Sequence, residues 1–175
     1  MLVAIIPASG SGVRYGKPKI FARIDGRTFL ELIQETLSKA GIDEVLVARD
    51  LNTSSMLESI RAVVSSVIMD SHFHGNDSPV TAYLIFPVDH PLVTVKTVVM
   101  LRDAHQRHPE LVLRPVFEGR KGHPIVIPAN LDLWVDDENN GLAGIIQKTG
   151  IKILDLETDD ENILRNLNFP PPEPI

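Results

Sequence analysis

Cysteine is absent from the 175-residue sequence, and long apolar runs are absent as well. Without cysteine the chain has no disulfide framework, no thiolate metal site and no cysteine nucleophile, which fits a reducing compartment. The apolar runs reach only a handful of residues, so none is long enough to cross a membrane. Residues 1–7 lack the basic start and the cleavage site of a secretory signal. We therefore expect a cytoplasmic protein with no membrane partner.

Basic residues are in the minority, because 17 Lys and Arg stand against 23 Asp and Glu, for a net charge of −6. This balance argues against duplex nucleic acid as the main partner. The composition, with 43% hydrophobic and 23% charged residues, is ordinary for a soluble globular protein, and the length suits one domain. We expect this domain to cover residues 1–169, followed by a proline-rich tail over residues 170–175.

Short apolar runs alternate with helical patterns along the chain. A capping box of Thr28 and Glu31 begins the clearest helix, which Gly41 ends. Residues 118–122 predict a hairpin or a bulged turn. The alternation predicts a single Rossmann-like, three-layer α/β domain with a mostly parallel, mixed sheet. The predicted strands are residues 2–8, 44–48, 63–69, 83–88, 111–117, 123–127 and 151–156, and the predicted helices are residues 28–41, 52–62, 94–107 and 140–148.

The loop after the first predicted strand is rich in glycine and serine. Small residues let backbone N–H groups approach an anion closely, and Arg14 and Lys19 can neutralise its charge. Five of the 17 basic residues fall within residues 14–27 of this acidic protein. The loop therefore predicts a polyphosphate site, with a plain connection carrying solvated cations as the alternative. The small residues are Ala8, Ser9, Gly10, Ser11 and Gly12.

Two other phosphate-binding motifs do not fit this loop. A P-loop needs Gly-Lys-Ser/Thr after the glycines, and the sequence has none at that spacing. A dinucleotide-binding turn needs an acidic residue about 20 residues further on, whereas Asp50 lies roughly twice that far along. Pro18 would also break the helix that should follow such a turn. An oxidoreductase is therefore disfavoured.

Asp89 follows the predicted strand 83–88. Ligands of an open parallel sheet bind at the carboxyl ends of its strands, so Asp89 and the loop that begins at Ala8 are expected at one edge. A carboxylate beside bound phosphates is what Mg²⁺ requires, because this ion keeps several waters and takes one or two protein oxygens. The sequence therefore predicts a magnesium ligand here, with a cap for the next helix as the alternative role.

Four segments, in this order, carry a resemblance to a known family. Residues 7–19 resemble the nucleotidyltransferase signature, and residues 87–91 resemble the strand-end Asp-x-Pro motif of the molybdenum-cofactor guanylyl- and cytidylyltransferases. Residues 114–124 resemble the cytidylyltransferase branch, and residues 166–170 are similar to a motif whose last acidic or amide side chain helps to hold the metal. The chain is thus identified as a member of the MobA-like NTP transferase family, which implies a fold of the nucleotide-diphospho-sugar transferase type.

The resemblance implies a set of site residues. His123 would contact the base or the acceptor phosphate, unless Gly-His-Pro only shapes a turn. No general base is obligatory, because an acceptor phosphate is already ionised at neutral pH, so catalysis would come from alignment and charge. The set comprises Arg14, Lys19 and Asp89 for catalysis, Ala8, Ser9, Gly10, Ser11, Gly12, Arg14, Lys19 and Asp70 for the nucleotide, and Asp89 and Asn168 for Mg²⁺.

These residues together predict an Mg²⁺-dependent nucleotidyltransferase. It would move a nucleoside monophosphate from CTP or GTP to a small phosphorylated acceptor, by resemblance of the molybdopterin type, and release pyrophosphate. Two alternatives stay open. The loop also resembles that of the methylerythritol-phosphate cytidylyltransferases, which act on a sugar or polyol phosphate. The amides Asn166 and Asn168, with the short connection 70–81, suit a nucleotide-binding regulator without turnover.

The connection over residues 70–81 leaves no room for a crossover helix, so one face of the sheet should lose part of its cover. We expect the segment around Trp134 with the tail, or a second copy of the chain in a homodimer, to cover that face. Trp134 itself is expected in the core. The remaining polar candidates are expected at the surface, namely His72, His74, His105, His108 and the acidic residues Asp155, Glu157, Asp159, Asp160 and Glu161.

Overall fold

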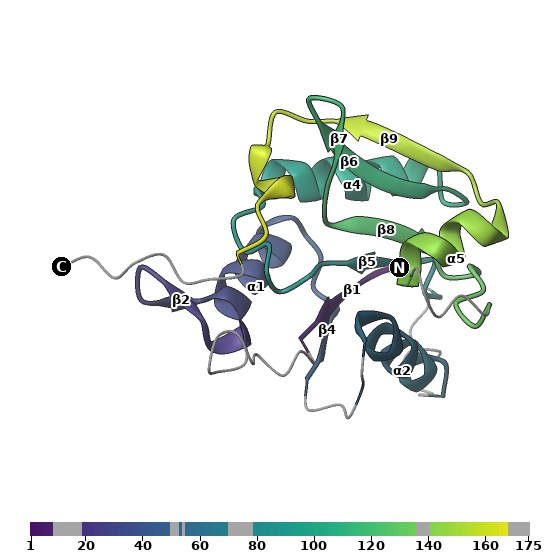
Figure 1. Cartoon of the computed structure of the whole chain (residues 1–175), viewed down its shortest axis with the longest axis horizontal. Helices are drawn as coiled ribbons and strands as arrows, with labels where there is room; N and C mark the ends of the chain where they lie inside the picture. Colours follow the sequence, from purple (N-terminus) through teal and green to yellow (C-terminus); the bar gives the residue numbers. More distant parts are fainter. Residues whose placement is uncertain (9–18, 50–52, 54, 70–78, 136–140, 168–175) are drawn as a thin grey trace.

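The computed structural model describes residues 1–8, 19–49, 53, 55–69, 79–135 and 141–167 (Figure 1). Within these residues, seven strands form one sheet in the order β4-β1-β5-β8-β6-β7, and β9 also pairs with β6. A separate two-stranded ribbon is formed by β2 and β3. The elements are β1 (Leu2–Pro7), η1 (Lys19–Phe21), β2 (Arg23–Ile24), β3 (Arg27–Thr28), α1 (Phe29–Lys39), β4 (Val45–Ala48), α2 (Met56–Met69), β5 (Ala82–Ile85), α4 (Val95–Arg107), β6 (Val112–Phe117), β7 (Arg120–Lys121), β8 (Ile125–Pro128), α5 (Gly141–Thr149), β9 (Ile153–Glu157) and η2 (Glu161–Leu164).

The strand directions confirm the predicted mixed α/β sheet. β1 runs parallel to both of its neighbours, with Ile5 opposite Leu46 of β4 and Ile85 of β5. β8 is antiparallel to β5 and β6, and β9 is parallel to β6. The carboxyl ends of β1, β4 and β5 therefore meet at one edge of the sheet, where the amino end of β8 also lies.

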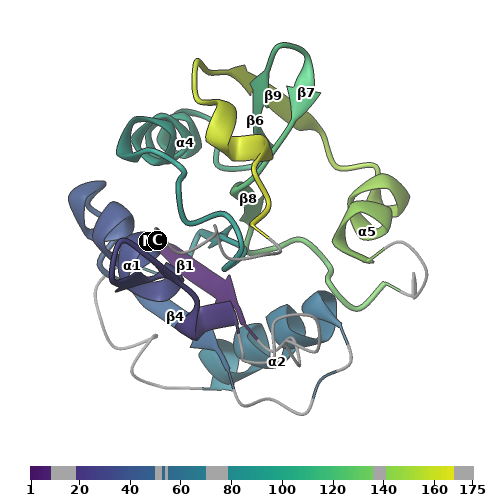
Figure 2. The same ribbon diagram turned by 60° about the vertical axis from the view of Figure 1, so that its left-hand side comes forward.

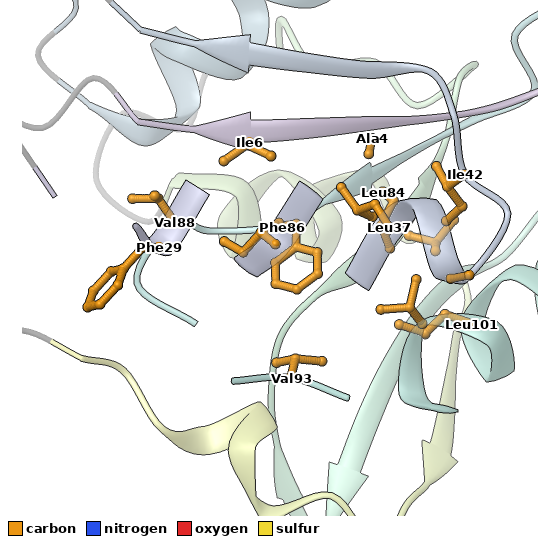
Figure 3. Packing of buried hydrophobic residues seen from close by; sticks show 14 of the residues in the cluster. Ala4, Ile6, Phe29, Leu37, Ile42, Leu84, Phe86, Val88, Val93 and Leu101 are labelled. Carbon is orange, nitrogen blue, oxygen red and sulfur yellow. The ribbon is translucent and has the colours of Figure 1, made fainter. Parts of the chain in front are cut away.

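Helices cover both faces of this sheet, as the two views show (Figures 1 and 2). Alternate residues of β1 point to opposite faces, so Ala4 and Ile6 belong to the cluster that contains α1 and α4, while Val3 and Ile5 belong to that of α2 and α5. Figure 3 shows the first cluster around the fully buried Phe86. Burying a side chain of this size stabilises the fold by about 1.5 to 3 kcal/mol.

The helix signals in the sequence are confirmed at α1 and α4. The side chain of Thr28 accepts a hydrogen bond from the Glu31 backbone, and the Glu31 carboxylate accepts one from the Thr28 backbone at 2.7 Å. Gly41, which follows the C-cap, has a φ of 70°, in the left-handed region that favours glycine. Thr94 is the N-cap of α4. Local capping chemistry thus fixes where both helices begin.

The predicted strand over residues 63–69 is wrong, because these residues form the second half of α2. Their β-branched composition favoured a strand, but Leu57, Ile60, Val64 and Val67 are buried at helical spacing against the sheet. The crossover from β4 to β5 therefore contains a helix, α2, which covers one face of the sheet. The reason for expecting the tail or a second copy of the chain on that face is removed.

Three further expectations about burial are wrong. Trp134 is 52% exposed instead of lying in the core, and His105 is buried with its Nε2 3.0 Å from Oγ1 of Thr81. Asp160 is buried instead of lying at a solvated edge. Among the described residues, no helix combines the length and the apolar character that a membrane crossing needs.

Candidate active site at the carboxyl edge of the sheet

The start of the glycine-rich loop and Asp89 lie at the same edge of the sheet, as the sequence predicts. Ala8 continues the pairing beyond β1, since its N–H donates to the carbonyl of Ala48 at 3.0 Å. On the other side of β1, the N–H of Phe86 donates to the carbonyl of Ile5 at 2.9 Å. The carboxyl ends of β1 and β5 are therefore adjacent at this edge, with Ala8 directly after the first strand and Asp89 after the second.

Several residues of the predicted site fall outside the described part of the chain, so their placement stays a prediction. Lys19 is described only through its backbone, as the first residue of η1. Ala8 is buried. The residues outside the described ranges are Ser9, Gly10, Ser11, Gly12, Arg14, Asp70 and Asn168, together with His72, His74 and the tail 170–175.

Asp89 is held by contacts from two directions. Its side chain is 17% exposed, and its Oδ1 lies 3.8 Å from Nε2 of the adjacent His90. Its backbone carbonyl accepts a hydrogen bond from the N–H of Leu167 at 2.8 Å. The backbone of Leu167, which directly precedes Asn168, is therefore hydrogen-bonded to the backbone of Asp89. Asp89 does not cap the next helix, because Thr94 is the N-cap of α4, so the alternative role in helix capping is wrong.

His123 lies beside His90, although the two residues come from distant parts of the chain. Their ring centroids are 5.1 Å apart, with the planes tilted by 55°. Burial, and to a lesser degree the nearby His90, lowers the pKa of His123 to about 4, while Asp89 opposes the shift. Nδ1 of His123 has no hydrogen-bond partner within the described part of the chain. At neutral pH the edge thus presents a neutral imidazole next to Asp89.

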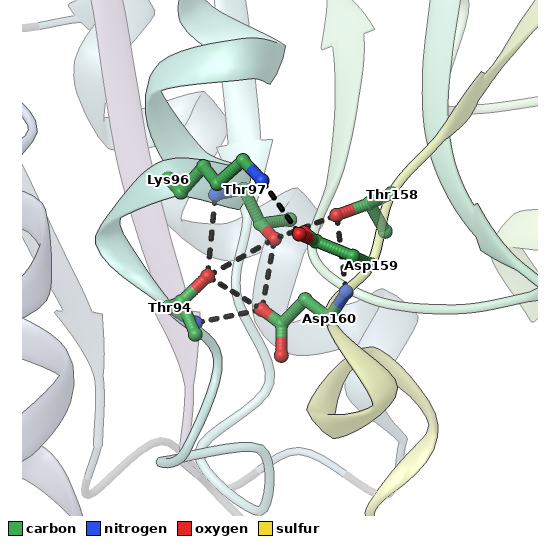
Figure 4. Close-up of polar contacts among 6 residues, drawn as sticks. All are labelled: Thr94, Lys96, Thr97, Thr158, Asp159 and Asp160. Carbon is green, nitrogen blue, oxygen red and sulfur yellow. Dashed lines mark hydrogen bonds and ion pairs between the residues drawn. The ribbon is translucent and has the colours of Figure 1, made fainter.

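Asp160 fastens the C-terminal segment to the start of α4 (Figure 4). Its Oδ2 accepts hydrogen bonds of 2.8 Å from the backbone N–H of Thr94 and from the hydroxyls of Thr94 and Thr97. Its Oδ1 accepts from the backbone and side chain of Asn162 at 3.1 and 3.0 Å. Burial raises the pKa of this carboxyl, but the hydrogen bonds outweigh that effect, so the pKa is lowered. A charged carboxylate therefore joins α4 to η2.

The same C-terminal segment also orients His123. The carbonyl of Ile163 in η2 accepts a hydrogen bond from the backbone N–H of His123 at 3.0 Å. A Cβ added to Gly122 would lie 2.6 Å from both Cγ1 and the carbonyl oxygen of Ile163, so only glycine allows this approach. Residues 160–167 thus contact the start of α4, the turn before β8 and Asp89 in succession.

Sequence reasoning missed Asp160 because it stands among five acidic residues that share the same composition signal. Within that group, Asp155 forms a two-point pair with Arg114 (2.8 and 3.1 Å), and Asp159 pairs with Lys96 at 2.7 Å. The one available clue is the spacing of Asp160 and Asn162, which is typical of a capping residue that accepts from a backbone N–H two residues on.

We predict that His123 makes the protein less stable at acidic pH. An unfolded histidine has a pKa of about 6.5, whereas that of folded His123 is about 4. The unfolded state therefore binds more protons between these values, and stability is lost as the pH falls from about 6.5 to about 4. Urea unfolding at pH 7 and pH 4.5 should show a loss about 2 kcal/mol larger in wild type than in His123→Gln.

The exposed His108 supplies the matched control for this prediction. His108→Gln should lose the same free energy of unfolding as wild type between pH 7 and pH 4.5. His105, whose pKa is lowered by burial and by the nearby N-terminal ammonium, contributes a background loss of the same sign to all three proteins. An identical acid loss in wild type and His123→Gln would contradict the assignment of the effect to His123.

The mixed sheet, with Ala8 after β1 and Asp89 after β5 at one edge, has the fold of a nucleotidyltransferase. The chain belongs to the MobA-like NTP transferase domain family, whose match covers residues 4–148. This confirms the family predicted from the four segments.

Solved structures of nucleotidyltransferases share this fold. Bifunctional IspDF from Campylobacter jejuni has a TM-score of 0.72 at 16% identity, over 96% of this chain and 52% of that one, so the chain spans about half of the bifunctional protein. The 2-C-methyl-D-erythritol 4-phosphate cytidylyltransferase from Thermus thermophilus has a TM-score of 0.66 at 17% identity, over 93% of this chain and 91% of that one. A nucleotidyl transferase from Methanothermobacter thermautotroptrophicus has a TM-score of 0.65 at 19% identity, over 96% of this chain and 92% of that one. These likenesses support the fold.

Proposed function

We propose that the protein transfers a nucleoside monophosphate from CTP or GTP to a small phosphorylated acceptor and releases pyrophosphate. The observation that carries the proposal is the meeting of Ala8, Asp89 and Leu167 at one edge of the sheet. Ala8 begins the loop that suits a triphosphate, Asp89 supplies a carboxylate that suits a metal, and Leu167 directly precedes Asn168. Family membership supports the same class of reaction.

The reaction needs no protein nucleophile. An oxygen of the acceptor phosphate attacks the α-phosphorus of the triphosphate, and the bond between that phosphorus and the bridging oxygen to the β-phosphorus breaks, so pyrophosphate leaves with its electron pair. Backbone N–H groups of residues 8–12, with Arg14 and Lys19, would hold the triphosphate and neutralise its charge. His123 is neutral at pH 7 and adds no like charge that would repel these cations.

Asp89 fits a magnesium ligand. Its carboxylate is partly exposed at the strand end, and Mg²⁺ is commonly bound through one or two carboxylates, several waters and substrate phosphates. The described residues contain no group of three or more acidic or histidine side chains that could enclose an ion, which suits a metal held largely by phosphates and water. Asp89 would hold the ion, with Asn168 as a second oxygen ligand. Bound Mg²⁺ would offset negative charge on the phosphates.

One assay of pyrophosphate release can distinguish two classes of acceptor from each other, and both from a regulator that binds nucleotide without turnover. The resemblance of residues 114–124 to the cytidylyltransferase branch favours a molybdopterin-type acceptor, whereas the likeness to a methylerythritol-phosphate cytidylyltransferase favours a polyol phosphate. Pyrophosphate release should be measured with Mg²⁺, each of the four nucleoside triphosphates and an acceptor of each class. Release that requires both a triphosphate and an acceptor supports the proposal. Tight triphosphate binding without release would support a regulator instead.

We predict that Arg14→Ala and Lys19→Ala each weaken triphosphate binding by about tenfold or more, because a charge-assisted hydrogen bond to phosphate contributes roughly 1.5 to 3 kcal/mol. Titration calorimetry with CTP and GTP measures the change. Arg27→Ala is the matched control, since Arg27 lies in the same basic stretch but pairs with Glu35 on α1. Unchanged affinity in both variants, or an equal loss in Arg27→Ala, would remove the assignment of the loop to phosphate binding.

A further inference from the structure

A cavity of about 670 Å³ lies between α5 and the far half of the sheet, and it reaches the edge described above at His123. Its apolar lining comes from β6, β8, β9 and α5. The end toward the carboxyl end of β6 carries the polar side chains of Arg114, Lys121 and His123, and Gln147 of α5 is a further polar lining residue. The size lies within the range of about 300 to 1,000 Å³ that is typical of small-molecule sites. The main apolar lining residues are Val112, Ile125, Leu142, Ile146 and Ile153.

At the polar end of the cavity, Lys121 is the main positively charged side chain that can bind a ligand. The guanidinium of Arg114 is already engaged by both carboxylate oxygens of Asp155. Lys121 is exposed and has no ion pair within the described residues. His123, between the cavity and His90, is neutral at pH 7. The polar end therefore suits an anion, and it is the end of the cavity that is nearest to Asp89.

The place of the cavity in the sheet separates it from the triphosphate loop. The loop follows β1, whereas the cavity is lined by β8, β6 and β9, which lie on the other side of β5 in the strand order. Neighbouring strands are about 4.8 Å apart, so β1 and β6 are separated by roughly 15 Å. Asp89 follows β5, between the two. A triphosphate at β1 and a second substrate in the cavity would thus approach Asp89 from opposite sides.

We propose that this cavity binds the body of the phosphorylated acceptor, and that this body is apolar rather than polyhydroxylated. The inference rests on the proposed function. Away from the polar end, Gln147 is the one lining side chain among the described residues that offers hydrogen bonds, so a polyol would turn most of its hydroxyls toward apolar side chains. An unsatisfied buried polar group is unfavourable. An aromatic or alkyl body instead covers Ile153, which is 41% exposed although it is large and apolar. The phosphate of such an acceptor lies toward Lys121 and His123.

The test compares two phosphate monoesters of the same charge, 1-naphthyl phosphate and glycerol 3-phosphate. Naphthyl fluorescence reports binding to the full chain without any nucleotide, and glycerol 3-phosphate is measured by competition. We expect the naphthyl ester to bind at least about tenfold more tightly, because it buries far more apolar area. It should not displace a triphosphate. Equal affinities, or displacement of the triphosphate, would overturn the proposal.

Two pairs of variants locate the binding. Ile153→Asn should weaken naphthyl phosphate binding about fivefold or more, while Ile68→Asn, at another exposed isoleucine (55% exposed) outside the cavity, should not. Lys121→Gln should weaken both esters, while Lys152→Gln, another exposed lysine, should weaken neither. Ile153→Asn without effect would overturn the proposal. A dimer in light scattering that Ile153→Asn converts to a monomer would overturn it as well, because the cavity would then be an interface.

Failure of this inference can be told from failure of the proposed function. Ester binding is measured without a triphosphate, so it does not depend on turnover. Pyrophosphate release with glycerol 3-phosphate but not with 1-naphthyl phosphate would retain the nucleotidyltransferase and overturn the apolar acceptor. Binding of the naphthyl ester in the cavity, without release from any triphosphate, would contradict the proposed function, and with it the assignment of the cavity to an acceptor.

Discussion

Asp89→Asn is expected to lower Mg²⁺-dependent turnover by at least about a hundredfold, since a metal-held charge contributes several kcal/mol to such a transition state. The substitution keeps the shape of the side chain and removes its charge. The backbone carbonyl of residue 89, which accepts from Leu167, is unaffected. The thermal midpoint of the metal-free protein should therefore stay nearly unchanged. Steady-state pyrophosphate release and thermal unfolding measure the two effects.

The binding of the triphosphate supplies the control for Asp89→Asn. Affinity measured without Mg²⁺ should equal that of wild type, whereas the gain in affinity on adding Mg²⁺ should be reduced in the variant. A variant that unfolds easily, together with a wild type whose nucleotide binding ignores Mg²⁺, would make Asp89 a structural residue. The magnesium assignment would then be wrong.

Asp160→Asn is expected to destabilise the protein by about 2 to 3 kcal/mol, because hydrogen bonds to a charged group contribute about 1.5 to 3 kcal/mol net. The amide would keep one acceptor oxygen and turn an N–H₂ group toward donors from Thr94 or Asn162. The lowered pKa of Asp160 gives a second signature. Its stabilisation is present above the unfolded pKa of about 3.9 and is lost as the pH falls through the folded pKa. Wild type should therefore lose more stability on acidification than the variant does.

Asp159→Asn is the matched control for Asp160→Asn, one residue away. Asp159 has a side chain that is 73% exposed and pairs with Lys96 at the surface. Exposed ion pairs contribute little, so this variant should unfold close to wild type in urea. Equal stability of the two variants would show that the buried carboxylate does not fasten the C-terminal segment to α4.

Local signals in the sequence were sufficient for much of the fold. The capping box of Thr28 and Glu31 depends only on residues three apart, and the apolar runs of β1 and β5 predict strands buried on both faces. The predicted strand over residues 63–69 was wrong because the prediction used local signals alone. A run rich in valine and isoleucine has the composition of a strand, and its buried residues here also have helical spacing. Packing of residues 63–69 against β1 and β4 in the folded protein stabilises the helix rather than a strand.

The candidate site was predictable only where topology implies proximity. Asp89 and Ala8 follow parallel strands, so their common edge could be predicted before the strand order was known. The contact of His123 with His90, the burial of Asp160 and the bond from Leu167 to Asp89 join residues that are 33 to 78 positions apart. No local pattern encodes such contacts, since they depend on how η2 and the turn before β8 pack together.

The most direct measurement of the proposed reaction is a ³¹P NMR spectrum of the products. Wild-type protein with Mg²⁺, CTP or GTP and a phosphate monoester should produce pyrophosphate and a nucleoside diphosphate ester of the acceptor in equal amounts. Both should be absent when the acceptor is left out, and neither should form with Asp89→Asn in the same time. Spectra in which every triphosphate stays intact with every acceptor, or in which only orthophosphate appears, would contradict nucleotidyl transfer by this protein.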